Sequence, residues 1–395
     1  MKKLTRGHVV IGLILFAALC VFMVFKISTA LTVRPQNGQQ EDVITAGCCT
    51  TYPGNDVIQG GAHQVIPHQY ELPQIAHHVI TPVTPPARPP LVSGAENNPI
   101  MFYPRFPLEQ AITPIPADPW DMLIFPVSQW RDSRFELFSW DRYPEILIID
   151  LATLAIQERF FHRLAFFVEK AGFRGRLSHD HEIGHLHGWN AHNYQASDLA
   201  NFFQTARRTN FPLLDEEWEL EAILLRSGVL ALDTFGYLIP GRGAILTLTR
   251  ESIPALRTRF MAHEVFHGLF FIDADFREFS RDRWEIFPEF GQRFLKTFFA
   301  IQEYCLDYEF LLVNEFMGHL LQLPIAQVPW FFGQHVPNRL FREGFAHALP
   351  ERYELRDGVR FWPDLSDLFV SEAEIFSRYA YERWGLVAGR VWRPR

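Results

Sequence analysis

The first strong pattern along the chain is an uncharged, apolar run over residues 9–25, which follows several basic residues and ends at Lys26. As a helix, this run would span about 25 Å, slightly less than the roughly 30 Å hydrocarbon core of a bilayer. We expect an N-terminal membrane anchor over residues 1–33, with a cleavable signal peptide as the alternative. Either segment would place the rest of the chain outside the cytoplasm, and the basic flank favours a cytoplasmic N-terminus for the anchor.

Residues 34–118 show neither helical nor strand periodicity, and about half of the chain's 27 prolines lie here. Proline-rich segments adopt extended, polyproline-like conformations with few backbone donors to pair. We therefore expect this segment to be a tether between the anchor and a folded body.

From residue 119 onward the pattern changes to strands alternating with helices. Alternation predicts a half-buried strand over 134–140, and short apolar or β-branched runs predict strands over 145–150 and 244–249. Helical spacing predicts helices over 151–171, 197–207, 215–227, 254–270, 288–304 and 308–322, with Ser252 as the cap of the fourth. A capping box predicts a last helix that starts at Ser371. The expected fold is mixed α+β and helix-rich after residue 250, with an unassigned part over 119–240 and a metal-binding part over 241–395.

Composition narrows the class of protein. The 395 residues are 48% hydrophobic, which excludes disorder throughout, and four cysteines are too few for a disulfide scaffold. A net charge of −8 argues against a nucleic-acid partner.

The strongest chemical signal is the sequence H-E-x-x-H at residues 263–267, inside a predicted helix. Residues i and i+4 share a helical face, so both imidazoles, of His263 and His267, can bind one Zn²⁺. Glu264 stands one residue along, where it would accept and return the proton of an attacking water. The motif predicts a hydrolase with one zinc per chain and Glu264 as its catalytic base and acid.

With its helix and the strand before it, this motif resembles the zincin metallopeptidases, whose H-E-x-x-H helix lies beneath a substrate-aligning edge strand. The pair Asn314-Glu315 on a later predicted helix resembles the gluzincin arrangement, in which a glutamate completes the zinc site. The resemblance implies a small sheet and Glu315 as the third ligand, and it covers roughly residues 240–325. His319 stands where gluzincins commonly carry an aspartate. It could orient a ligand, bind as a fourth ligand or stabilise the transition state.

Other acids compete with Glu315 for the third position. Asp273 has the metzincin-like spacing from the second histidine, although that class needs a glycine where Phe270 stands. Further carboxylates are available at Glu278, Glu285 and Glu289. Stabilisation of a developing oxyanion needs a tyrosine, histidine or arginine, for which the later part of the chain offers His335, His347, Tyr353, Tyr379 and Tyr381.

A second H-E-x-x-H occurs at residues 181–185, in a segment rich in histidine. Gly184 and Gly188 disfavour a continuous helix, so we expect a loop leading into the helix over 197–207. The loop could hold a second metal, form a wall of the substrate cleft or serve the fold alone. The cleft or second-site candidates are His185, His187, Trp189, Asn190, His192 and Tyr194.

These patterns together predict a membrane-anchored, extracytoplasmic zinc hydrolase that acts on a peptide or protein. Two alternatives remain from the residues alone. One is an amidase of the same zinc chemistry that acts on cell-wall peptides, and the other is a non-catalytic envelope protein that retains the helix as scaffold.

Overall fold

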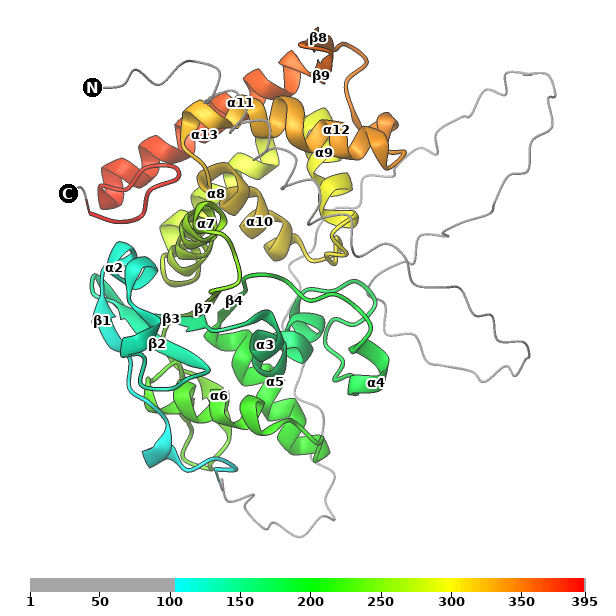
Figure 1. Cartoon of the computed structure of the whole chain (residues 1–395). Coiled ribbons are helices and arrows are strands. Elements are labelled where there is room, and N and C mark those ends of the chain that lie inside the picture. Colours follow the sequence, from blue (N-terminus) through cyan, green and yellow to red (C-terminus); the bar gives the residue numbers. More distant parts are fainter. Residues whose placement is uncertain (1–103, 394–395) are drawn as a thin grey trace, which may run out of the picture. The chain divides into compact units, whose positions relative to one another are not determined.

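The computed structural model describes residues 104–393 (Figure 1). The expected anchor over 1–33 and most of the expected tether over 34–118 therefore lie outside the described residues. Within the described part of the chain, no helix combines the length and apolar character that a membrane span requires.

A five-stranded mixed sheet divides the described body into two layers. Its spatial order is β1 (Ile115–Ala117), β2 (Phe135–Trp140), β3 (Tyr143–Leu151), β7 (Ala244–Thr249) and β4 (Asn193–Gln195). β1 runs parallel to β2 and β3 parallel to β7, whereas the β2–β3 and β7–β4 pairs are antiparallel. Two hairpins lie apart from this sheet, β5 (Leu230–Leu232) with β6 (Leu238–Pro240) and β8 (Glu354–Arg356) with β9 (Val359–Phe361).

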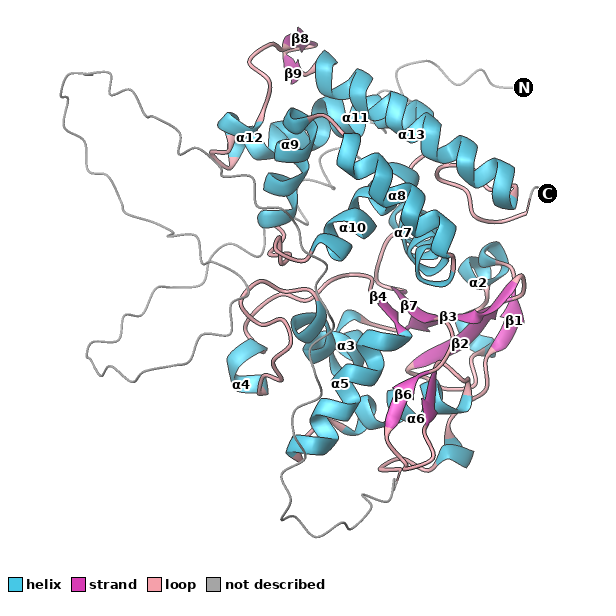
Figure 2. Ribbon diagram, turned by 180° about the vertical axis from the view of Figure 1, so that it is seen from behind, coloured by secondary structure: helices cyan, strands magenta, loops and turns pink. Residues whose placement is uncertain are grey.

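Helices cover both faces of the sheet (Figure 2). One face packs against α3 (Leu154–Val168), α5 (Ala196–Thr209) and α6 (Asp215–Arg226). On the other face α7 (Pro254–Ile272) packs against β7 and β4. The remaining helices join it in one larger hydrophobic core: α2 (Pro119–Ile124), α8 (Ala274–Ile286), α9 (Glu289–Ala300), α10 (Glu309–Leu321), α11 (Val328–Trp330), the π-helix η5 (Phe331–His335), α12 (Val336–Arg342) and α13 (Pro363–Trp384). Short helical turns occur at η2 (Leu108–Gln110), η3 (Val127–Gln129), α4 (Asp180–Ile183), η4 (Ile325–Gln327) and η6 (Ala346–Ala348). The expected mixed α+β character is confirmed.

The strands differ from the predictions in their burial, in where the sheet begins and in how it joins the two parts of the chain. β2 is buried at all six positions instead of alternating, because helices cover both of its faces. β1 lies in the sheet although its residues fall in the segment 34–118, so the folded body begins before residue 119. β3 and β7 pair with each other from either side of residue 240, so the parts 119–240 and 241–395 share one sheet.

Most expected helices occur, with differences at their ends. α3 stops at Val168, short of Gly172, and the N-cap of α7 is Ile253, while the Ser252 hydroxyl contacts Thr249 instead. The expected start at Ser371 is wrong, because α13 begins at Pro363 and continues through the capping-box sequence.

One of the two glutamates of that sequence, Glu372, contacts α8. Glu372 accepts two hydrogen bonds from Arg283 at 2.6 and 2.7 Å and so stabilises the middle of the helix. Helix α8, which carries Arg283, was missed altogether in the sequence.

Close packing against the sheet positions α7. A Cβ built on Gly268 would lie 3.0 Å from a methyl carbon of Ile146 on β3, so a side chain at this position would crowd the contact between helix and sheet. α7 also packs against α10, and the contact between these two helices contains the candidate site.

Candidate metal centre

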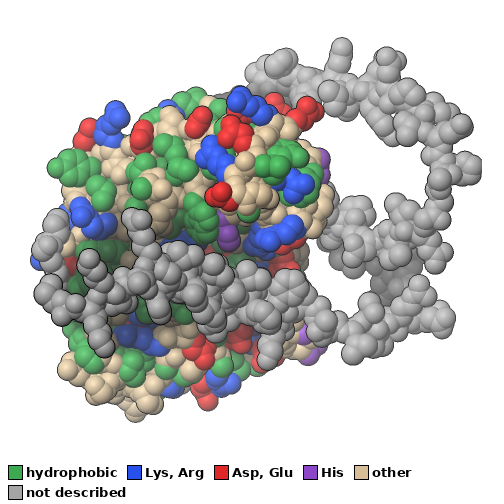
Figure 3. Space-filling view, turned by 45° about the horizontal axis from the view of Figure 1, so that its top comes forward, with side chains coloured by type: hydrophobic (Ala, Val, Ile, Leu, Met, Phe, Trp, Pro, Cys, Tyr) green, Lys and Arg blue, Asp and Glu red, His purple; other side chains and the backbone are tan. Residues whose placement is uncertain are grey.

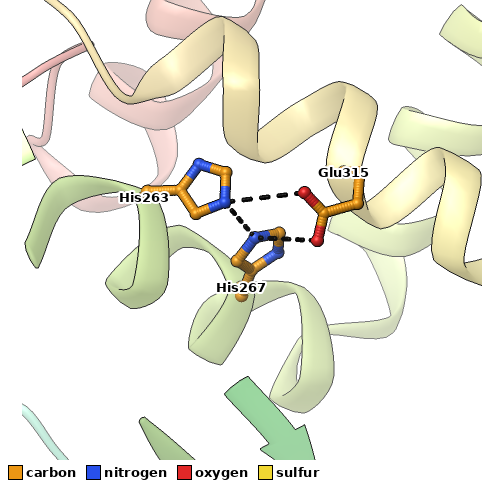
Figure 4. Close-up of side chains that lie close together, drawn as sticks. All are labelled: His263, His267 and Glu315. Carbon is orange, nitrogen blue, oxygen red and sulfur yellow. Dashed lines mark hydrogen bonds and ion pairs between the residues drawn. The ribbon is translucent and has the colours of Figure 1, made fainter. Parts of the chain in front are cut away.

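Helices α7 and α10 direct three buried side chains toward one another (Figure 4). The Nε2 atoms of His263 and His267 are 2.9 Å apart. Oε2 of Glu315 lies 3.6 Å from Nε2 of His263, and Oε1 lies 3.7 Å from Nε2 of His267. These three residues could hold a metal ion, and they are the group of potential ligands that the described part of the chain brings together.

The donor spacing fits a tetrahedral ion. Metal–ligand bonds of about 2.0–2.1 Å place neighbouring ligand atoms roughly 3.3 Å apart, and the three observed separations lie on both sides of this value. Oε2 of Glu315 and Nδ1 of His263 are buried without a hydrogen-bond partner among the described residues. A buried carboxylate with an unpaired oxygen is costly, and a bound cation would remove that cost.

Burial also favours the ligand forms of both histidines. It lowers the pKa of His263 to about 3 and that of His267 to about 4, so both imidazoles are neutral at physiological pH. Nδ1 of His267 lies 2.8 Å from Oδ1 of Asn314 and donates to it, which leaves the Nε2 lone pair directed at the cluster. The asparagine before Glu315 therefore fixes the orientation of a ligand on the opposite helix.

Glu264 is held by the edge strand of the sheet. Nδ2 of Asn193, on β4, donates to Oε2 of Glu264 at 3.0 Å, and Nδ2 of Asn314 reaches Oδ1 of Asn193 at 3.4 Å. Burial raises the pKa of Glu264 well above its ordinary value, the charge of Glu315 adds to this, and the Asn193 hydrogen bond opposes it. Strand, acid and ligand helix thus form one hydrogen-bonded unit.

The sequence did not identify Asn193 as a site residue. The only signal available was the alternation of side chains along β4, and this strand is three residues long, too short for an alternating pattern to be recognised. Its period places Asn193 on the α7 side of the sheet and its neighbours His192 and Tyr194 on the α3 side.

His319 lies beside the cluster but outside the group of three. Its ring centroid is 4.9 Å from that of His263, and its Nδ1 donates to the backbone oxygen of Glu315 at 3.1 Å. Gly318 next to it allows the two helices to meet, since a Cβ there would lie 2.6 Å from Cε1 of His267.

The structure places the rival third ligands elsewhere. Asp273 caps α8 and pairs with Arg383 at 2.5 Å. Glu278 and Glu285 lie exposed on α8 beside Arg281, and Glu289 is exposed at the start of α9. None of these carboxylates faces His263 and His267.

The second H-E-x-x-H does not form a helical ligand pair. Its residues span the one-turn helix α4 and the loop after it, where His181, His185 and His187 are exposed. They form no metal-ligand group within the described residues. The expected loop is confirmed, and nothing in the described part indicates a second metal there.

The cleft candidates of that loop separate into different environments. His192 and Tyr194 are buried on the α3 side, with 2.9 Å between the Tyr194 hydroxyl and Nδ1 of His192, so neither lines a cleft beside the cluster. Asn190 is half-buried. Trp189 stacks on Tyr304 at 4.7 Å between ring centroids, and the Lys170 ammonium lies 3.7 Å from the centre of its ring.

Two further groups near the cluster were missed. Burial raises the pKa of Tyr304 well above its ordinary value, and the neighbouring carboxylates Glu315, Glu169 and Glu264 raise it further. Glu169 is itself buried at the end of α3, where burial and then the charges of Glu315 and Glu264 raise its pKa. Three buried carboxylates, those of Glu169, Glu264 and Glu315, thus lie near the Tyr304 hydroxyl. We call this part of the site the Tyr304 side.

The expected oxyanion stabilisers lie in other surroundings. His335 stacks on Trp330, Tyr379 stacks on Phe279, and Tyr353 packs near Trp362. His347 lies near Phe345, and Tyr381 is exposed on α13.

Comparisons with protein-family models, with curated proteins and with solved structures found no match to this chain.

Proposed function

We propose that this protein is a zinc-dependent hydrolase of peptide bonds that resembles the gluzincins. The observation that carries the proposal is the buried group of His263, His267 and Glu315 with Glu264 beside it. Two imidazoles and one carboxylate are a donor set that suits zinc, and three protein ligands leave one position open, as catalytic sites require.

The residues divide the chemistry between them. Bound zinc would polarise the substrate carbonyl and make an attacking water more acidic. Glu264 would take the proton of that water and deliver it to the leaving amine, a role that suits a carboxylate whose pKa is raised by burial. Asn193 and Asn314 would hold Glu264 and His267 in the required orientations.

The edge position of β4 supports a peptide as the substrate. Among the described residues, β4 ends the sheet and pairs on one side only, with β7. An extended peptide can add to such a free edge through main-chain hydrogen bonds. Because Asn193 of this strand touches Glu264, a peptide along β4 would bring a carbonyl group close to the acid. Acidic and basic side chains are interspersed on the face in Figure 3, and the net charge of −8 does not favour a polyanion.

Metal analysis and hydrolysis assays on the purified chain test this proposal. We expect about one zinc per chain, lost in His263→Ala and retained in Glu264→Gln, with hydrolysis of a mixed peptide library abolished in both. His181→Ala is the matched control, because it removes the first histidine of the other H-E-x-x-H and should change neither quantity. Zinc binding without hydrolysis of the library or of cell-wall peptides would support the scaffold alternative and reject the enzyme.

We further propose that the apolar run over residues 9–25 anchors the hydrolase to a membrane, with the body outside the cytoplasm. Fractionation of cells that express the chain should recover it with membranes and leave it accessible to added protease. Recovery in the soluble fraction after cleavage near residue 30 would indicate the signal peptide instead.

A further inference from the structure

Arg259 lies on α7 one helical turn before His263 and has an unusual environment. Its side chain is half-buried, with the guanidinium carbon 4.4 Å from the centre of the Phe331 ring. Its Nε donates to Oε1 of Gln322 at 2.9 Å, which ties α7 to the end of α10. The two terminal nitrogens, which normally bind carboxylates, have no acidic partner in the part of the chain that the structure describes.

The two fully buried arginines of the described residues, in contrast, are paired with acids. Arg257, two residues earlier on α7, pairs with Asp150 at 2.8 Å, and Arg163 pairs with Glu217 at 3.0 Å. Burial lowers the pKa of Arg259 to about 10, so the guanidinium is still charged at neutral pH. A partly desolvated cation without an anion is unfavourable, and an anionic ligand would remove the penalty.

The position of Arg259 coincides with the less deeply buried side of the metal group. The side chain of His263 is 11% exposed and that of His319 is 9% exposed, whereas His267 and Glu315 are 0% and 2% exposed. Arg259 lies four residues before His263, so the two side chains share one face of α7. The Phe331 ring that contacts the guanidinium is in turn 6.5 Å from the His319 ring, between centroids. A substrate that approaches the metal from this less buried side would therefore meet this guanidinium.

Basic side chains lie near Arg259, whereas acidic side chains lie near Tyr304. Burial, and then the charges of Arg259, Arg339 and Arg342, lower the pKa of His335 to about 4, so the three guanidinium groups lie near this ring. Of these three, only Arg339 pairs with an acid in the described residues, Glu343 at 2.9 Å. The Tyr304 side carries buried carboxylates instead. An anionic group is therefore favoured at the Arg259 side and disfavoured at the Tyr304 side.

We propose that Arg259 binds a carboxylate of the substrate and so determines specificity for peptides with an anionic group beside the scissile bond. A guanidinium fixed through Nε presents its remaining N–H groups as a planar fork that matches a carboxylate. The carboxylate can be the C-terminus of the peptide or the side chain of an aspartate or glutamate. This inference rests on the proposed function for the hydrolytic site, while carboxylate binding itself can be measured without turnover.

The test measures binding to the zinc-loaded Glu264→Gln chain, which would hold peptides without cleaving them. The probes are acetyl-Ala-Ala-Phe, its C-terminal amide, and acetyl-Ala-Asp-Ala-amide, with dissociation constants from calorimetry. We expect the free acid or the aspartyl peptide to bind at least about 10-fold more tightly than the neutral amide, as a charge-assisted pair provides. The comparison of the two anionic probes distinguishes the C-terminal from the side-chain source.

Variants at Arg259 separate recognition from packing. Arg259→Gln in the same chain should reduce the preference to about 2-fold or less, and Arg259→Lys should keep part of it because the charge remains. Arg277→Gln is the matched control: Arg277 is also half-buried, lies on α8 just beyond the other end of α7, and donates only to backbone oxygens of Phe270 and Phe271. A purely structural role would change the stability of the Arg259 variants without changing the ratio.

Equal affinity for all three probes, absence of binding, or a preference that survives in Arg259→Gln would each overturn the inference. Failure of the proposed function gives a different result, since a carboxylate preference would remain while the chain with Glu264 intact hydrolyses no peptide. Hydrolysis of peptides without any preference would reject the role of Arg259 and leave the hydrolase standing.

Discussion

At the scale of single residues, the site depends on hydrogen bonds that hold its reactive groups in place. The Glu264 carboxylate accepts a hydrogen bond from the side-chain amide of Asn193, and His267 is oriented by the side-chain amide of Asn314. Both amides are neutral, so they fix geometry without neutralising the carboxylate or protonating the imidazole. A catalytic carboxylate that stays in one rotamer acts on a well-placed water far more effectively than a mobile one.

Asn193→Ala should therefore separate catalysis from metal binding. We expect zinc content to stay near the wild-type value, because Asn193 is linked to the metal-binding residues only indirectly, through its hydrogen bond with Asn314. The kcat/KM for peptide hydrolysis should fall about 10- to 100-fold as Glu264 loses its fixed position. Asn190→Ala is the matched control from the same segment and should change kcat/KM little. Loss of zinc in Asn193→Ala would contradict this division of roles.

His192 gives a prediction about stability and pH. Burial lowers its pKa to about 3, against about 6.5 in an unfolded chain, so the folded state keeps this imidazole neutral. The stability contributed by the neutral form is fully present above pH 6.5 and is lost as the pH falls toward 3, because only the unfolded chain takes up the proton. Between pH 7 and pH 5 this one residue should reduce the free energy of unfolding by about 2 kcal/mol.

Urea unfolding of wild type and His192→Gln at both pH values measures that contribution. The variant should lose less stability between pH 7 and pH 5 than the wild type does. The other buried histidines affect both proteins equally and cancel in the difference. Identical pH dependence in the two proteins would show that the pKa of His192 is the same in the folded and the unfolded chain.

At the scale of elements, the metal group exists because α7 and α10 approach closely. Gly318 on α10 faces both histidine rings, and Gly268 on α7 faces the sheet. The first glycine therefore allows α10 to approach α7, and the second allows α7 to approach the sheet. Neither glycine has an unusual backbone angle, so it is the absent side chain that matters at both positions.

Gly318→Ala should weaken metal binding more than it weakens the fold. The new Cβ would lie 2.6 Å from Cε1 of His267 and 3.0 Å from Cε1 of His263. Both rings would have to shift, so their Nε2 atoms would no longer point at a common metal position. We expect zinc affinity to fall at least about 10-fold, a typical loss when ligand orientation is disturbed. Competition with a chromogenic chelator gives the affinity.

Gly268→Ala provides the matched comparison for that variant. Its Cβ would press on Ile146 at 3.0 Å, which should destabilise the helix–sheet contact by about 1–3 kcal/mol and leave the zinc stoichiometry unchanged. Equal zinc affinity in Gly318→Ala and the wild type would show that the two helices adjust without moving the rings.

At the scale of the whole molecule, one sheet joins two hydrophobic cores, and the site lies on the side of the larger core. β4 and α7 contact each other, and the ligands come from two helices separated by α8 and α9 in the sequence. A bound ion would thus cross-link distant parts of the chain. Such a ligand binds only the folded state and so raises its stability.

Removal of the metal should lower the thermal midpoint of unfolding. At a free zinc concentration about 1,000 times the dissociation constant, binding contributes about 4 kcal/mol, which for a body of this size corresponds to a shift on the order of 5–10 °C. Scanning calorimetry with and without 1,10-phenanthroline measures the shift. His263→Ala should unfold at the same temperature with and without the chelator. A wild-type midpoint that does not respond to the chelator would contradict metal binding at this site.

By itself, the sequence determined those features that depend on local spacing. The helical period brings His263 and His267 onto one face, and apolar runs identify β3, β7, α7 and α10. These features follow from 3.6 and 2.0 residue periods, which need no knowledge of the partner elements. The resemblance to gluzincins added Glu315, which lies beside both histidines.

Only the tertiary structure decided which groups from different elements meet. It separated Glu315 from Asp273, placed Asn193 rather than His192 beside Glu264, and left Arg259 without an acidic partner among the described residues. The two H-E-x-x-H sequences also have different environments: that of residues 263–267 is buried between helices, and the histidines of residues 181–185 are exposed in a short turn and loop. The physical reason is that contacts between elements depend on how helices and strands pack in three dimensions, and distance along the chain does not determine that packing.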